Sequence, residues 1–167
     1  HGKPAETPAA IVSRGTAEDQ QVLDALNELP AEIEQAILNY KFREAQALFM
    51  NASRLGNKYL ADAEPWKTAK SDMNRTATIL NISLQITANL AIVTEPFLPF
   101  TAEKILSFLN IEHINWDMLG SFDLLSEGHT LGKSELLFEK IEDEVVEKQV
   151  QKLHDTKKLN EAENEKT

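Results

Sequence analysis

The chain contains no cysteine among its 167 residues. It can therefore form no disulfide, offer no thiol nucleophile and build no thiolate metal site. The histidines are scattered, without the spacing of metal ligands, at His1, His113, His129 and His154. We expect no metal and no cofactor in this chain.

Long hydrophobic runs are also missing. No uninterrupted apolar stretch reaches the roughly 18 residues that cross a bilayer, and no signal-like segment opens the sequence. We therefore expect a cytoplasmic protein with no membrane partner. A composition of 42% hydrophobic and 26% charged residues is that of a globular protein with one substantial core.

Motifs for catalysis are absent from the sequence. It has no glycine-rich phosphate loop, no nucleophile elbow and no histidine near a suitable serine. Most carboxylates fall on the expected wet faces of helices, where nothing would activate them. These absences favour a binding or scaffold module over a chain with its own catalytic centre.

The net charge of −10 argues against a nucleic-acid partner at first sight, because phosphate binding depends on Lys and Arg. Residues 40–75, however, carry seven Lys and Arg against four Asp and Glu, a net +3, while the rest of the chain carries −13. A basic patch on an acidic body suits contact with RNA through one face. An ordinary solvated helix face would give the same pattern, and charge alone does not separate the two.

The pattern of the chain predicts three regions. Residues 1–15 are irregular and rich in proline and glycine, so we expect an extended lead-in. This start without an initiator methionine suggests a fragment of a larger protein. Residues 16–147 are expected to form an all-α helical bundle, and residues 148–167, which have few apolar positions, a solvated C-terminal helix or linker.

A first helical stretch is expected from Thr16, with Asp19 completing the first turn. Pro30 should kink this stretch or divide it into two helices. One apolar stripe runs along both sides of the proline: Val22, Leu23, Leu26, Leu29, Ile33, Ile37 and Tyr40. The acidic residues are assigned to the wet face, without chemistry: Glu18, Asp19, Asp24, Glu28, Glu32 and Glu34.

A second helix is expected from Lys41 to Ala61. Its seam for a neighbouring helix follows steps of three and four residues: Phe42, Ala45, Phe49, Ala52, Gly56 and Tyr59. A glycine inside a helix costs up to about 1 kcal/mol compared with alanine, so Gly56 should allow close approach of another backbone. Asn57 and Tyr59 lie near the helix end, where we expect them to fix the following turn.

A third helix should begin after a cap at Ser71 or Asp72 and continue to Glu95. Residues 82–87 alternate as a strand would, but residues 66–95 contain neither glycine nor proline and keep helical spacing. We therefore predict a helix. Apolar residues cover most of its circumference, as expected of the central helix of a bundle.

After Glu95 the chain should turn and then become irregular. Phe97 and Phe100 should form a packed corner, and Pro99 can open a helix that runs to Leu109. Beyond residue 110 we expect an irregular segment in which Trp116 and Leu119 cover the bundle. Residues 136–138, Leu-Leu-Phe, should bring one last apolar segment back to the bundle.

The candidate site lies where the second helix ends. Pro65 suits the first turn of a new helix, and Trp66 follows it, near Lys67, Lys70 and Arg54. An aromatic plane, a helix N-terminus and cations suit a nucleobase and its phosphate. The alternative is that Trp66 anchors the helix junction from inside the core.

These residues resemble a known family. The pattern Asn57-x-Tyr59 followed by Glu64-Pro65-Trp66-Lys67-x-Ala69-Lys70 is similar to the signature of the anticodon-binding helical bundle of bacterial methionyl-tRNA synthetase. The segment Pro96-Phe97-Leu98-Pro99 and the closing Leu137-Phe138-Glu139-Lys140-Ile141-Glu142-Asp143 also resemble it. The likeness covers roughly residues 20–145, and its motifs are specific.

The resemblance implies that the bundle recognises the CAU anticodon of tRNA(Met), with Trp66 stacked on its first base. The implied tRNA-binding set is Trp66, Pro65, Lys67, Lys70, Arg54 and Asn57. In this family an asparagine and an arginine one turn apart on the opening helix read the cytosine. No such pair precedes residue 16, so we expect that helix to be missing from this fragment.

The resemblance also implies a larger class I enzyme, methionine–tRNA ligase. The sequence holds neither a His-Ile-Gly-His-like nor a Lys-Met-Ser-Lys-Ser-like motif. ATP, methionine and any zinc would therefore belong to the catalytic part. In many bacterial relatives a tail of this kind leads to a further tRNA-binding domain through which the enzyme forms a homodimer.

Two alternatives stay open at this point. The chain could be the equivalent bundle of a related class I synthetase, which preference among anticodons would reveal. It could also be a helical protein-interaction module that never binds RNA and keeps Trp66 in its core. Accessibility of the indole to solvent separates this second alternative from the other two.

Overall fold

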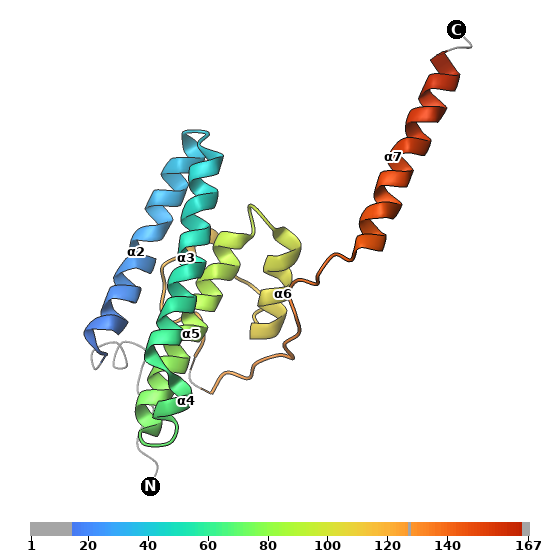
Figure 1. Cartoon of the computed structure of the whole chain (residues 1–167). Helices are drawn as coiled ribbons and strands as arrows, with labels where there is room; N and C mark the ends of the chain where they lie inside the picture. Colours follow the sequence, from blue (N-terminus) through green and yellow to red (C-terminus); the bar gives the residue numbers. More distant parts are fainter. Residues whose placement is uncertain (1–14, 127, 165–167) are drawn as a thin grey trace. The chain divides into compact units, whose positions relative to one another are not determined.

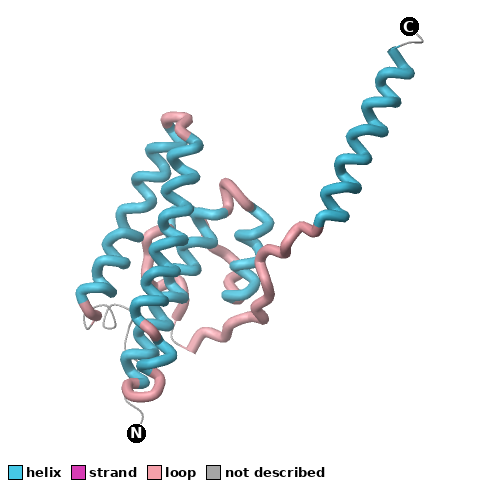
Figure 2. The backbone as a smooth tube through the Cα atoms, in the orientation of Figure 1, coloured by secondary structure: helices cyan, strands magenta, loops and turns pink. Residues whose placement is uncertain are grey.

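The computed structural model describes residues 15–126 and 128–164, and in these ranges every regular element is a helix (Figures 1 and 2). The predicted all-α fold class is therefore confirmed. The chain divides into two compact units, residues 1–135 and 136–167. The expected lead-in, residues 1–15, lies outside the described residues except for Gly15.

The described part of the first unit is a bundle of helices that run up and down. Figure 1 shows α2 and α3 as an antiparallel pair, with α5 beside α3 and the short α4 between their ends. The elements are α2 (Ala17–Leu38), α3 (Phe42–Ala63), α4 (Pro65–Thr68), α5 (Met73–Thr94), α6 (Pro99–Leu109) and the 3-10 helix η1 (Trp116–Met118).

The start of α2 is fixed by a capping box. The Thr16 backbone N–H donates to Asp19 Oδ2 at 2.9 Å, and the Asp19 N–H donates to Thr16 Oγ1 at 3.4 Å, as the sequence predicts. Pro30 lies inside the helix, which continues through it as one element of 22 residues. Of the two alternatives for Pro30, a kink or a division into two helices, the division is wrong.

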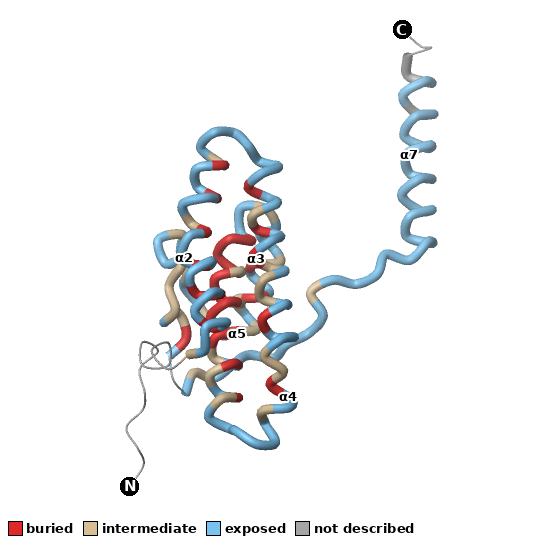
Figure 3. The backbone as a smooth tube through the Cα atoms, turned by 60° about the vertical axis from the view of Figure 1, so that its left-hand side comes forward, coloured by how far each residue is buried: buried red, intermediate tan, exposed pale blue. Residues whose placement is uncertain are grey.

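The core lies between α2, α3 and α5, whose facing sides carry the buried residues (Figure 3). Gly56 allows the close approach that its position predicted, because a Cβ atom there would lie 2.9 Å from Cγ2 of Ile86 on α5. The predicted seam of α3 is confirmed at its other positions, but the Phe42 side chain is 58% exposed. It stands at the very start of α3, where no neighbouring helix covers it.

α5 is the central helix, and the prediction of a helix over a strand is confirmed. It contacts α2, α3, α4, α6 and η1. By length and composition α5 could also cross a membrane, yet 56% of its apolar window is buried inside the bundle.

Two fully buried amides of α5, Gln85 and Asn89, hold the irregular segment that follows η1. Gln85 binds the backbone of Leu124 and Leu125, and Asn89 accepts from the Gly120 N–H at 2.6 Å.

The corner between α5 and α6 is packed on one side only. Phe97 stacks on Phe49 of α3, with ring centroids 5.6 Å apart. Phe100 is 79% exposed, so the prediction of two packed aromatics is wrong for this residue, which begins the outer face of α6. Leu119 is buried and Trp116 packs against the core, as predicted.

The second unit contains α7 (Asp143–Asn164), whose described side chains are all exposed. Residues 136–138 belong to this unit, and Leu136 and Phe138 are 79% and 65% exposed. The prediction that this apolar segment returns to the bundle stays a prediction. The domain boundary expected at residues 147 and 148 stays a prediction, and α7 begins before it.

Candidate nucleic-acid interface

The candidate site is built on a sharp turn between α3 and α5. Glu64 caps the end of α3 in the left-handed conformation, with φ 44° and ψ 58°, and the same residue precedes α4. Pro65 is buried at the first position of α4, as its sequence position predicts. Trp66 follows it and is 56% exposed. The interpretation of Trp66 as a core anchor is therefore wrong.

The cations beside Trp66 differ in their surroundings. Lys67 and Lys70 are both exposed. Lys67 Nζ lies 2.7 Å from Glu64 Oε1, so part of its charge is already balanced within the turn. α4 has four residues and no side-chain cap, so it contributes little helix dipole. Any attraction for phosphate at this turn has to come mainly from the lysine side chains.

Arg54 and Asn57 lie on α3, before the turn, and both are exposed. They are three residues apart and therefore share one face of the helix. Arg54 Nη1 donates to Asn51 Oδ1 at 2.9 Å on the same face. Asn57 does not occupy the buried, turn-fixing position that the sequence suggested.

Tyr59 is buried, but it ties together other elements than expected. Its hydroxyl donates to Asp19 Oδ1 of α2 at 2.7 Å, so it fixes α2 and not the turn at Pro65. Arg75 of α5 binds both oxygens of the same carboxylate, through Nη1 to Oδ2 and through Nη2 to Oδ1 at 2.9 Å. The assignment of Asp19 to the wet face is wrong, because its side chain is only 1% exposed.

The electrostatics of this network follow from burial and pairing. Burial is the largest influence on the pKa of Asp19 and raises it, but hydrogen bonds, above all from Arg75, together outweigh it and lower the pKa. Burial and then the bond to Asp19 hold the pKa of Tyr59 well above its ordinary value. The hydrogen bond to Asp19 raises the pKa of Arg75. Asp19 and Arg75 are thus charged and Tyr59 neutral over the physiological range.

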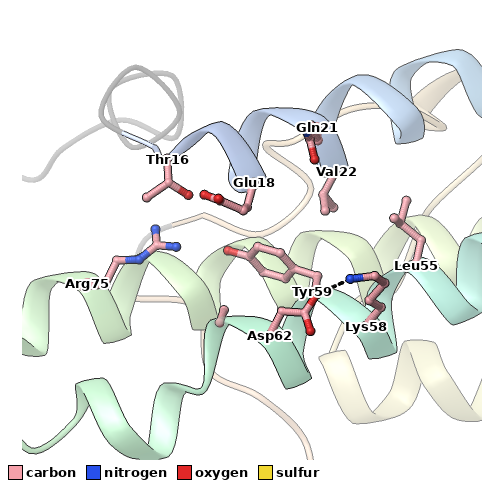
Figure 4. Close-up of a pocket in the computed structure, with 10 residues that line it drawn as sticks. Thr16, Glu18, Gln21, Val22, Leu55, Lys58, Tyr59, Asp62 and Arg75 are labelled. Atoms are coloured by element: carbon pink, nitrogen blue, oxygen red, sulfur yellow. Dashed lines mark hydrogen bonds and ion pairs between the residues drawn. The ribbon is translucent and has the colours of Figure 1, made fainter.

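A cavity of about 500 Å³ lies beside this network, between α2, α3 and α5 (Figure 4). Its charged lining residues are of both signs: Glu18, Lys58, Asp62 and Arg75. Lys58 forms an ion pair with Asp62, and Arg75 is held by Asp19. The cations of the cavity are therefore already paired. We therefore keep Trp66, and not this cavity, as the candidate site.

Among residues 15–126 and 128–164, no group of three His, Asp or Glu residues is placed to hold a metal ion. The described side chains also show no buried nitrogen or oxygen without a hydrogen-bond partner. The chemistry that this part of the molecule offers is binding through an exposed aromatic ring, cations and an amide.

The sequence matches the model of a protein family described as the anticodon-binding domain of methionyl-tRNA ligase, over residues 9–158. The chain belongs to this family. The name matches the resemblance seen in the sequence motifs. The anticodon-binding domain is 59% identical to methionine–tRNA ligase of Parabacteroides distasonis over 96% of the chain, and 59% identical to that of Phocaeicola vulgatus over 89% of the chain.

The chain spans only about a quarter of these relatives, 24% of the first and 22% of the second. The fold of the anticodon-binding domain is also similar to a crystal structure of methionyl-tRNA synthetase from Mycobacterium tuberculosis. The TM-score is 0.67 at 18% identity, over 81% of the domain's chain and 30% of the other. The two relatives that are 59% identical favour the methionine family over a related class I synthetase.

Two features of the site region were not predicted from the sequence. Asp19 was recognised as a capping residue, but its partners lie 40 and 56 residues away, and no local pattern identifies them. The second feature is a hydroxyl pair, Thr68 and Thr76, behind α4. Thr76 stands three residues before Ile79 on the buried stripe of α5, and that spacing is the signal that could have found it.

Proposed function

We propose that this domain recognises the CAU anticodon of tRNA(Met) as part of a methionine–tRNA ligase that charges this tRNA for translation. Membership of the family supports the partner. The single structural observation that carries the proposal is the exposure of Trp66, 56%, directly after a buried proline. An indole exposed to solvent beside a buried proline suits stacking with an unpaired base.

The residues around Trp66 have separate roles in this proposal. Trp66 stacks on the first anticodon base, and Pro65 sets the position of the indole. Lys67, Lys70 and Arg54 approach the phosphates of the loop, and Asn57 offers an amide to a base or sugar. Stacking on an aromatic side chain contributes about 1 to 3 kcal/mol per base, so the indole should dominate the affinity.

The proposal also covers the whole enzyme. We assign ATP and methionine binding, and any zinc site, to those three-quarters of the relatives that the chain does not match. The enzyme works in the cytoplasm without a membrane partner. It forms a homodimer through a further C-terminal domain.

The test is a binding titration with a fluorescently labelled RNA hairpin whose loop presents CAU. Fluorescence anisotropy gives the dissociation constant for the parent and for Trp66→Ala. We expect Trp66→Ala to weaken binding by about 1 to 3 kcal/mol, while circular dichroism keeps the parent's helical signal. Trp116→Phe is the matched control, because Trp116 packs against the core and should leave RNA binding unchanged.

Three outcomes contradict the proposal. If Trp66→Ala loses its helical signal, the side chain is structural. If the parent binds the CAU hairpin no more tightly than the same stem without an unpaired loop, recognition of the anticodon loop fails. If no RNA binds at salt concentrations near 0.1 M, the proposed contact of this domain with an anticodon loop fails.

A further inference from the structure

α4 cannot hold its own geometry. Four residues form a single helical turn, and such a turn is unstable without tertiary contacts. The residue before it, Glu64, has a left-handed backbone and no side-chain cap. The direction of the exposed Trp66 indole must therefore be set by whatever holds α4 against the rest of the bundle.

A pair of threonine hydroxyls forms the side-chain part of that connection. Thr68 Oγ1, on the last residue of α4, lies 2.7 Å from Thr76 Oγ1 in the first turn of α5. Thr76 is 6% exposed, so water cannot readily replace its partner. Each hydroxyl also reaches the carbonyl three or four residues earlier, Pro65 O at 3.2 Å and Asp72 O at 3.0 Å.

Proton counting shows that the pair is a unit. Three contacts share two hydroxyl protons, and the two hydroxyl oxygens, 2.7 Å apart, would repel each other without a proton between them. Either Thr76 therefore donates to Thr68 and Thr68 to Pro65 O, or Thr68 donates to Thr76 and Thr76 to Asp72 O. Both arrangements keep the bond between the threonines. Removal of either hydroxyl breaks it.

The far side of this connection is fixed to the bundle. Asp72 caps α5 by accepting from the Arg75 N–H at 2.9 Å, and its own N–H donates to Thr68 O at 2.7 Å. Arg75, next to Thr76, is held by the buried carboxylate of Asp19. The first turn of α5 is therefore a firm support to which α4 is attached.

We propose that Thr68 and Thr76 are positioning residues for RNA recognition: their hydroxyl pair fixes α4 on α5 and thereby sets the direction of the Trp66 indole. This inference rests on the proposed function, because it names what holds the same binding residue in place. Neither threonine contacts the RNA. Their contribution is to reduce the number of indole orientations that binding would otherwise have to restrict.

The test uses the 167-residue chain with Trp116→Phe, in which Trp66 is the remaining tryptophan of two. Thr76→Val keeps the shape of the side chain and removes the hydroxyl, and Thr76→Ser keeps the hydroxyl. We expect Thr76→Val to lower the steady-state anisotropy of the indole without RNA. It should also weaken binding of the CAU hairpin by about 3- to 10-fold. Thr76→Ser should restore both values.

The matched control is Thr87→Val, also on α5, whose hydroxyl donates to Ser83 O at 2.8 Å. It should change neither readout, even if it alters thermal stability as much as Thr76→Val. Thr68 is half-buried, so Thr68→Val serves as the second variant if Thr76→Val does not fold. The double variant should lose no more than one single variant, because the two hydroxyls act together.

The proposal is overturned if a folded Thr76→Val or Thr68→Val keeps the parent's indole anisotropy and RNA affinity. It is also overturned if the losses of the two single variants add. If the parent does not bind the CAU hairpin, the proposed function fails. The indole anisotropy measured without RNA still decides whether the hydroxyl pair positions Trp66.

Discussion

Asp19 and Arg75, 56 residues apart, form a two-point ion pair that joins the first turn of α2 to the first turn of α5. Tyr59 adds α3 to the same carboxylate. Three helices of the bundle therefore meet at one buried charge. The support on which the α4 turn rests depends on this charge, because Arg75 is the neighbour of Thr76.

Loss of the Asp19 charge should destabilise the domain. Asp19→Asn leaves the Arg75 guanidinium with a weaker partner in a half-buried position, so the free energy of unfolding should fall by about 2 to 4 kcal/mol. Urea denaturation measures the change. The control is Asp62→Asn, which removes an exposed ion pair with Lys58 and should cost about 0 to 0.5 kcal/mol. Equal losses in the two variants would show that the buried pair contributes nothing special.

The stability contributed by Asp19 should depend on acid pH. Its pKa is lowered in the folded state from a reference value of 3.8, so the unfolded chain takes up the proton first as the pH falls. The contribution is fully present above about pH 5 and is lost as the pH falls through 3.8 towards the lower folded pKa. The difference in unfolding free energy between the parent and Asp19→Asn should therefore shrink below about pH 4. A constant difference down to pH 2 would contradict this assignment.

The two lysines of the candidate site should differ in their dependence on salt. Lys70→Ala should reduce the slope of log K against log salt for the CAU hairpin by about 1, as expected when one phosphate contact is lost. Lys67→Ala should reduce it by less, because Glu64 already balances part of that charge. Lys41→Ala is the control, since Lys41 forms a similar exposed pair with Glu44 at 3.1 Å where α3 begins. An unchanged slope in both site variants would remove these lysines from the interface.

Alanine at Gly56 should destabilise the bundle although alanine favours helices. The gain in propensity is up to about 1 kcal/mol, but the new Cβ would lie 2.9 Å from Cγ2 of Ile86, which is 2% exposed and stiff at χ1. Overpacking of this kind costs about 1 to 3 kcal/mol, so a net loss near 1 kcal/mol is expected in chemical denaturation. In an Ile86→Leu background, which removes the β-branch, the loss should be smaller. Additive effects of the two changes would show that the atoms do not compete for this space.

The local patterns of the sequence predicted most of the fold. The capping box at Thr16 and the helical spacing of α5 are determined by neighbours three or four residues away, and both are confirmed. The close approach at Gly56, predicted from a glycine on the seam of α3, is also confirmed. The strand-like alternation around Gln85 has a tertiary cause, because this buried amide binds the backbone of Leu124 and Leu125.

Other predictions were wrong because the partner lies far away in the sequence, or because exposure depends on the tertiary arrangement. Asp19 has the pattern of a wet helix face, and only its distant partners make it a core residue. Phe100 is apolar in sequence but exposed in the structure. For the candidate site, the sequence located Trp66 and the signature that surrounds it. It did not reveal the ion pair of Lys67 or the hydroxyl pair that holds α4.

Three joints of the bundle use left-handed backbone without glycine: Tyr40 after α2, Glu64 after α3 and Asn110 after α6, with φ of 59°, 44° and 53°. Each side chain makes the native joint strained, and each also narrows the conformations open to the denatured chain. Folding therefore loses less conformational entropy at these points than it would with glycine. At Glu64 this restriction lies two residues before Trp66. The chain that leads into the candidate site therefore has fewer accessible backbone conformations before the bundle has assembled.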